Sequence, residues 1–166
     1  MNTLNILLPY EYASEIVKLN WRDILFAIEQ RFMTPDAAID HAVAVVNQVA
    51  NPPKAAVELA CLLKGESIHP YIEELVNEEV DDNNDSASEK IMFLTLNWVY
   101  NHKASYTEPL EIVEIIYADF NYPEEIASFV RYMPSEQPPL ASLELNRERL
   151  YRNWKEYLDR KAQSWK

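Results

Sequence analysis

The chain has 166 residues, of which 48% are hydrophobic and 25% are charged, a composition typical of a soluble globular protein of one-domain length. Its net charge of −12 disfavours DNA, RNA and anionic lipid as partners, because binding to them depends on Lys and Arg. Gly65 is the only glycine, which argues against tight hairpins, a phosphate-binding loop and a dinucleotide-binding turn.

Cysteine usage and hydropathy indicate a cytoplasmic protein. Cys61 is the only cysteine, so no intrachain disulfide can form, and its place in an apolar helical run predicts a small buried side chain. No stretch approaches the roughly 20 apolar residues that cross a membrane. The short apolar run at 5–8 is closed by Pro9 and does not fit a signal peptide. We therefore expect no membrane association.

Helix-start signals divide the first half of the chain into short helices. Asn20 is expected to cap one helix, Thr34-Pro35-Asp36 to begin another and Asn51 to cap a third. The second and third of these are rich in alanine, so we expect them to pack closely. The predicted helices of this half cover residues 10–18, 21–31, 35–49, 52–63 and 71–79.

The second half of the chain continues the helical pattern. Residues 81–86 are polar and form a loop, and Ser86 with Glu89 fits a capping box for the helix that follows. The apolar residues of that helix cover a broad arc, which predicts a central position in the core. The predicted helices of this half cover residues 87–102, 109–119, 122–132 and 141–163.

An aromatic corner separates the helices predicted at 109–119 and 122–132. Asn121 is expected to cap the second helix, with Pro123 in its first turn and Glu124 completing a capping box. Such a corner would fix two helices at a set angle, so its predicted role is structural. Its residues are Tyr117, Asp119, Phe120, Asn121, Tyr122 and Pro123.

These patterns together predict an all-α fold. We expect a compact single-domain bundle of about seven to nine helices over residues 1–166, with the charged helix at 141–163 packed on the body or extending from it. Strict apolar–polar alternation never persists, and Asn-Gly and Asp-Gly turns do not occur. The helix starts are irregularly spaced, which favours a compact domain over a regular solenoid.

No pattern points to a catalytic or metal site, and we expect neither a metal nor a cofactor. Glu66-x-x-His69 has the spacing of half a di-iron site, but the chain holds no second such motif. Asp81-x-Asn83-x-Asp85 resembles the start of a calcium loop. In that loop, however, Ser86 stands where glycine is needed and Met92 where glutamate is needed.

Residues 71–89 contain eight acidic residues and no Lys or Arg. Two interpretations stay open for this candidate acidic face. It is either a solvated helix edge and loop, or an electrostatic docking surface for a basic protein, which would raise the association rate and set the register of binding. The eight residues are Glu73, Glu74, Glu78, Glu79, Asp81, Asp82, Asp85 and Glu89.

The last predicted helix has the opposite charge. Residues 141–166 carry seven Lys and Arg against four Asp and Glu. We favour folding of this helix onto the acidic body of its own chain. Pairing with the acidic face of a second copy is the alternative, so a homo-oligomer stays open. The basic residues of its polar arc are Arg147, Arg149, Arg152, Lys155, Arg160 and Lys161.

Four segments resemble a family of uncharacterised bacterial proteins, the domain of unknown function 2247 family. They are Asn20-Trp-Arg-Asp-Ile-Leu25, Trp98-Val-Tyr100, Glu114-Ile-Ile-Tyr-Ala-Asp-Phe-Asn-Tyr-Pro-Glu-Glu125 and Arg131-Tyr-Met-Pro134. The similarity covers most of the chain, and its motifs are helix ends and packing aromatics. The resemblance implies a small helical bacterial protein. By analogy, families of this kind resemble immunity proteins, and no binding residue is carried over.

Three functions remain open on these grounds. The first is a non-enzymatic binding protein, an immunity protein that neutralises a basic toxin through the acidic surface. The second is a hydrolase whose carboxylates converge only in the fold, with Asp119 and Glu125 the first to inspect. The third is an adaptor subunit of a larger assembly.

Overall fold

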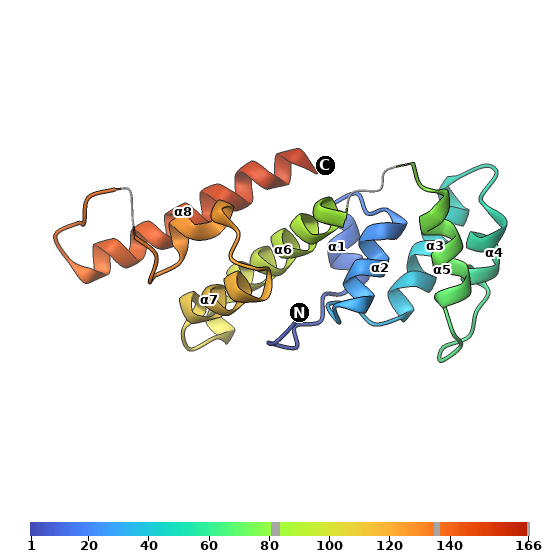
Figure 1. Cartoon of the computed structure of the whole chain (residues 1–166), viewed down its shortest axis with the longest axis horizontal. Coiled ribbons are helices and arrows are strands. Elements are labelled where there is room, and N and C mark those ends of the chain that lie inside the picture. Colours follow the sequence, from blue (N-terminus) through green and yellow to red (C-terminus); the bar gives the residue numbers. More distant parts are fainter. Residues whose placement is uncertain (81–83, 135–136, 166) are drawn as a thin grey trace. The chain divides into compact units, whose positions relative to one another are not determined.

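Eight α-helices and two short 3₁₀ segments form the secondary structure of the computed structural model, which describes residues 1–80, 84–134 and 137–165. These ranges contain no strand, so the expected all-α class is confirmed, and so is the irregular helix order (Figure 1). The elements are α1 (Tyr10–Ile16), α2 (Trp21–Glu29), α3 (Asp36–Gln48), α4 (Lys54–Ala60), α5 (His69–Glu78), α6 (Asn84–Asn101), η1 (Lys103–Ser105), α7 (Pro109–Asp119), η2 (Glu124–Phe129) and α8 (Leu143–Ser164).

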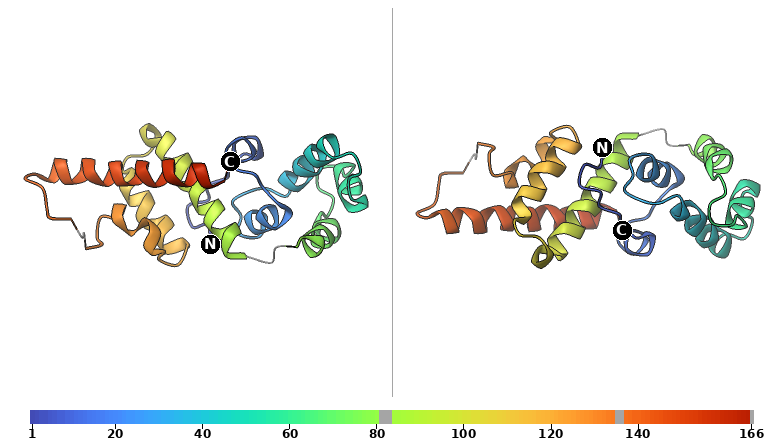
Figure 2. Two further views of the ribbon diagram at one scale, coloured as in Figure 1. Left: turned by 90° about the horizontal axis from the view of Figure 1, so that it is seen from above. Right: turned by 90° about the horizontal axis from the view of Figure 1, so that it is seen from below.

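The chain divides into two compact units. We call residues 5–91 the N-terminal unit, and residues 1–4 with 92–166 the C-terminal unit. In the N-terminal unit α3 and α4 lie side by side, and in the C-terminal unit α8 runs along η2 (Figures 1 and 2). The single domain expected over the whole chain stays a prediction.

Alanine side chains line the contact between α3 and α4. Ala38, Ala42 and Ala56 are completely buried where these helices pack. A methyl side chain leaves little volume between two helices, so their backbones can come close and still fill the interior. The close packing expected from the sequence is therefore present.

Contacts from three segments converge on the first turn of α2. Asn20 and Asp23 exchange side-chain and backbone hydrogen bonds, which confirms the predicted cap at Asn20. Glu79, the residue after α5, accepts a hydrogen bond from the N–H of Trp21. Lys90 of α6 forms a 2.8 Å ion pair with Asp23, which is buried. This cluster fixes the ends of α5 and α6 against the start of α2.

The helix starts predicted at Asn51 and Ser86 and the burial predicted for Cys61 are wrong. Helix α4 begins after Pro53 without a side-chain cap, so Asn51 does not cap it. Helix α6 begins before Ser86, which lies inside the helix. Helix α4 also ends at Ala60, and Cys61 in the following turn is exposed. The burial of Cys61 was predicted from a helix that continues to residue 63, but the helix ends one residue before Cys61.

The aromatic corner is the C-terminus of α7. Asn121 has a left-handed backbone with φ of 64°. Its N–H donates to the carbonyl of Ala118, and the N–H of Tyr122 donates to the carbonyl of Tyr117. These two bonds form a Schellman motif, in which Asn121 ends α7 instead of capping a second helix. The predicted cap at Asn121 is therefore wrong, and the expected second helix is replaced by the shorter η2, which follows Pro123.

Aromatic packing explains why the corner turns in this way. The rings of Tyr117 and Tyr122 meet edge to face with their centroids 5.3 Å apart. This is the apolar contact that accompanies a Schellman motif, and it holds Tyr122 in its own left-handed conformation, with φ of 56°. Tyr117 is buried beneath the exposed Tyr122 and Tyr132.

The core of the C-terminal unit is aromatic. Trp154, Tyr157 and Leu158 are buried on one face of α8. The ring of Phe129, from η2, stacks on Trp154 with a centroid distance of 6.1 Å and an interplanar angle of 6°. Leu143, the first residue of α8, is 90% exposed.

Candidate functional site

The predicted acidic face maps to solvent-facing positions. Glu73, Glu74 and Glu78 are exposed on α5, and Asp85 and Glu89 are exposed on α6. On α5 the opposite face is buried, and helical periodicity therefore holds the three glutamates outward.

The other three predicted acids do not join this set. Asp81 and Asp82 lie outside the described residues. Glu79 is half-buried and accepts hydrogen bonds from the N–H groups of Trp21 and Arg22. Burial raises the pKa of Glu79, and the two backbone bonds act in the opposite direction. The carboxylate of Glu79 therefore holds the start of α2 and does not belong to the exposed set. We define the α5 acidic face as the three exposed glutamates of α5, Glu73, Glu74 and Glu78.

No basic side chain of the described residues pairs with the α5 acidic face. Glu73, Glu74 and Glu78 form no ion pair with any residue that the structure describes. The N-terminal unit carries six Lys and Arg against 16 Asp and Glu, a net charge of −10, whereas the C-terminal unit carries nine against 11, a net of −2. Most of the negative charge of the chain therefore belongs to the unit that holds α5.

The basic residues of α8 bind mostly within their own unit. Arg147 forms two hydrogen bonds of 2.9 Å with Glu108 and holds the pKa of that carboxyl below its usual value. Lys161 pairs with Glu125 of η2. The remaining contacts are Lys155 with Asp159 and Arg149 with the carbonyl of Pro138. The choice between folding of this helix onto its own chain and pairing with a second copy stays a prediction.

The two carboxylates proposed for a hydrolase bind different partners. Asp119 accepts hydrogen bonds from the N–H and the hydroxyl of Thr3, at 3.0 and 2.5 Å. Glu125 is engaged by Lys161. In the structural corner, Asp119 therefore serves to bind the chain's first residues to the end of α7.

His41 is a buried titratable group that the sequence did not single out. Its Nδ1 and the hydroxyl of Tyr10 share a hydrogen bond of 2.8 Å, and its ring lies edge-on to Trp21 at 4.5 Å. Burial lowers the pKa of His41 to about 4. The neutral imidazole thus joins α1, α2 and α3 inside the N-terminal unit.

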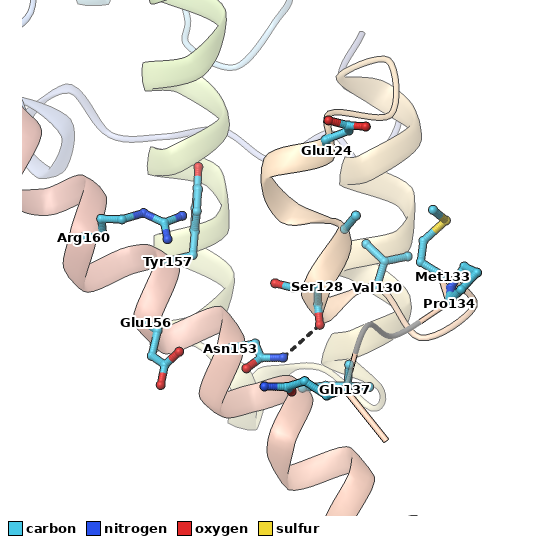
Figure 3. Close-up of a pocket in the computed structure, with 12 residues that line it drawn as sticks. Glu124, Ser128, Val130, Met133, Pro134, Gln137, Asn153, Glu156, Tyr157 and Arg160 are labelled. Atoms are coloured by element: carbon cyan, nitrogen blue, oxygen red, sulfur yellow. Dashed lines mark hydrogen bonds between the residues drawn. The ribbon is translucent and has the colours of Figure 1, made fainter. Parts of the chain in front are cut away.

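A pocket that sequence reasoning missed lies between η2 and α8 in the C-terminal unit (Figure 3). Its volume is about 430 Å³. Asn153 of α8 lines it and donates a 3.0 Å hydrogen bond to the carbonyl of Ser128. Charged side chains stand at its edge, namely Glu124, Glu156 and Arg160. No local pattern could have predicted it, because its walls come from segments about 30 residues apart and neither wall carries a motif.

The described ranges lack two other kinds of site. In residues 1–80, 84–134 and 137–165 no helix combines the length and apolar character required to span a bilayer. Within the same ranges no group of three or more His, Cys, Asp and Glu is placed to hold a metal ion.

The comparisons with known proteins place the chain in one family. No curated protein and no solved structure is significantly similar to it. A family model described as an uncharacterized protein conserved in bacteria (DUF2247) matches residues 10–162. This range includes all eight helices of the described chain except the last two residues of α8. The resemblance noted in the sequence is thus confirmed, and the chain belongs to the DUF2247 family of bacterial proteins.

Proposed function

We propose that this protein binds a basic protein partner through the α5 acidic face, and that the partner is a toxin which it neutralises as an immunity protein. The observation that carries the proposal is the exposure of Glu73, Glu74 and Glu78 without an ion pair to any described residue. In the C-terminal unit, by contrast, acids such as Glu108 and Glu125 are matched by bases of α8. A partner's Lys and Arg side chains would supply the missing charges.

The physical advantage of such a surface lies mainly in the rate of association. A unit with a net charge of −10 produces a field that attracts a basic partner and raises its on-rate by about 10- to 1,000-fold. Salt screens this field over a Debye length of about 10 Å at 0.1 M. Binding through the α5 acidic face should therefore slow steeply as salt is added.

The position of the glutamates lowers the stability of α5. Glu74 and Glu78 are four residues apart, so they repel each other, and Glu78 is the last residue of the helix, where its dipole disfavours negative charge. Replacing both by Gln should stabilise the protein by about 0.5 kcal/mol. A stability cost retained on an exposed face is typical of a surface used for binding.

The test begins with the partner, captured from the native bacterium's lysate at low salt and released at high salt. Its association with the full chain is then compared for Glu74→Lys/Glu78→Lys and the control Glu144→Lys/Glu148→Lys. The control changes two exposed glutamates with the same spacing on α8, so the change in net charge is identical. We expect the α5 variant to lose about tenfold in on-rate or more, and the control less than about twofold.

Two results would contradict different parts of the proposal. Equal on-rates for the two variants would exclude the α5 acidic face as the docking surface. A captured partner that does not inhibit bacterial growth when expressed alone, or whose inhibition this protein does not relieve, would exclude the immunity function and leave only binding.

A further inference from the structure

The pocket between η2 and α8 is braced at two points. At one point the side chain of Asn153 binds the carbonyl of Ser128 at 3.0 Å. At the other, Lys161 of α8 pairs with Glu125 of η2. Both members of that pair are mostly shielded, with 17% and 28% of their side chains exposed. These contacts set the spacing of the two walls, so the pocket is formed without a ligand. Its volume of about 430 Å³ falls within the range of small-molecule sites.

Opposite charges stand on the two walls beside the second brace. Arg160 precedes Lys161 on α8, and Glu124 precedes Glu125 on η2, so the brace fixes the backbone next to both residues. Figure 3 shows Arg160 on α8 and Glu124 on η2, so the two charges come from different walls. Neither forms an ion pair with a described residue. The guanidinium of Arg160 lies 6.0 Å from the centroid of the Tyr157 ring instead.

The rest of the lining combines amide and apolar groups with a second carboxylate, that of Glu156 on α8. Asn153 uses its amide N–H₂ in the brace, which leaves its side-chain oxygen as an acceptor. Val130, Met133 and Leu150 contribute apolar surface. The α8 wall carries Arg160 and Glu156, the η2 wall carries Glu124, and apolar surface lies between these polar groups. Such a lining matches a ligand that carries both charges and an apolar side chain.

We propose that this pocket binds a small zwitterion with apolar side chains, a free amino acid or a short peptide. Its carboxylate pairs with Arg160 and its ammonium group with Glu124. The guanidinium offers two parallel N–H donors to a carboxylate, and the glutamate accepts from an ammonium group. The proposal is independent of the α5 acidic face, whose residues belong to the other unit.

The test is an NMR titration of the ¹⁵N-labelled full chain with the dipeptide leucyl-leucine. We expect saturable shifts of the amide signals of Ser128, Asn153 and Tyr157 at millimolar peptide. N-acetyl-leucyl-leucine lacks the ammonium group and leucyl-leucine amide lacks the carboxylate. Each should bind about tenfold more weakly than the free dipeptide, because each loses one charge-assisted contact.

Variants assign the two charges to the two walls. Glu124→Gln and Arg160→Gln should each weaken binding about tenfold, and the double variant Glu124→Arg/Arg160→Glu should bind the dipeptide in the reverse orientation. Glu144→Gln and Arg152→Gln are the matched controls, since both residues are exposed on α8 outside the pocket, and they should leave binding unchanged. Absence of saturable shifts in the pocket, or equal binding of the blocked peptides, would overturn the proposal. Sensitivity to only one wall would do so as well.

Discussion

His41 should make the stability of the N-terminal unit depend on pH. It is 9% exposed, and its burial lowers the pKa from 6.5 to about 4. The unfolded chain therefore binds a proton at a higher pH than the folded chain does. The stability that neutral His41 allows is fully present above pH 6.5, declines as the pH falls, and is lost below about pH 4. The folded and unfolded pKa values of His41 differ by about 2.5, which at 1.36 kcal/mol per pH unit corresponds to a loss of about 3 kcal/mol.

The assay compares urea unfolding of the native chain and His41→Gln between pH 7 and pH 4, followed through the amide signals of α1, α2 and α3. Gln can still bond to Tyr10 but takes up no proton in this range. Every carboxylate titrates in both proteins, so the difference between their free energies of unfolding isolates His41. We expect that difference to change by about 3 kcal/mol over the range, of which about 2 kcal/mol is lost by pH 5.

A second variant separates burial from hydrogen bonding as the cause. Tyr10→Phe removes the hydroxyl that bonds to Nδ1 but keeps the ring that covers His41. Its overall stability should fall by about 1 kcal/mol, while its pH dependence stays. A difference between native chain and His41→Gln that stays constant within about 0.5 kcal/mol from pH 7 to pH 4 would refute the reasoning.

Three further predictions concern single contacts. Thr3→Val should lower the melting temperature of the C-terminal unit and cost about 1 kcal/mol, since it removes the hydroxyl bond to Asp119; an unchanged melting curve would mean that this bond is exchanged for water at no cost. Asn121→Ala should destabilise by about 1 kcal/mol and Asn121→Gly should not, because the position is left-handed; equal denaturant midpoints would contradict this. Glu79→Ala should cost about 1–2 kcal/mol in denaturant unfolding by exposing the first N–H groups of α2, and an effect as small as that of Glu73→Ala would exclude a capping role.

Helix ends could be predicted where a residue has one dominant role. Asn20 precedes an apolar-periodic segment and has Asp23 at the right distance, so the cap was readable from four residues. Asn121 satisfies the same local rule but also tolerates a left-handed backbone. Tertiary packing of Tyr122 on Tyr117 decided between these two roles, and no local pattern carries that information.

The candidate sites also divide into features that local sequence predicts and features that depend on tertiary contacts. The α5 acidic face was readable because charge and helical periodicity are both local properties of residues 71–89. The separate role of Glu79 could not be predicted, because the N–H groups that it binds lie 57 and 58 residues earlier in the chain. The pocket between η2 and α8 depends on the meeting of two distant segments, and its charged residues are ordinary surface residues in the sequence.

The contact between Thr3 and Asp119 joins residues 116 positions apart, and it has a consequence for synthesis. Residues 1–4 belong to the C-terminal unit, so the N-terminal unit is an insertion in the sequence of its neighbour. On the ribosome, residues 5–91 emerge before the helix that binds Thr3 has been made. The inserted unit can therefore fold first, and residues 1–4 gain their contact with Asp119 only after α7 has left the exit tunnel.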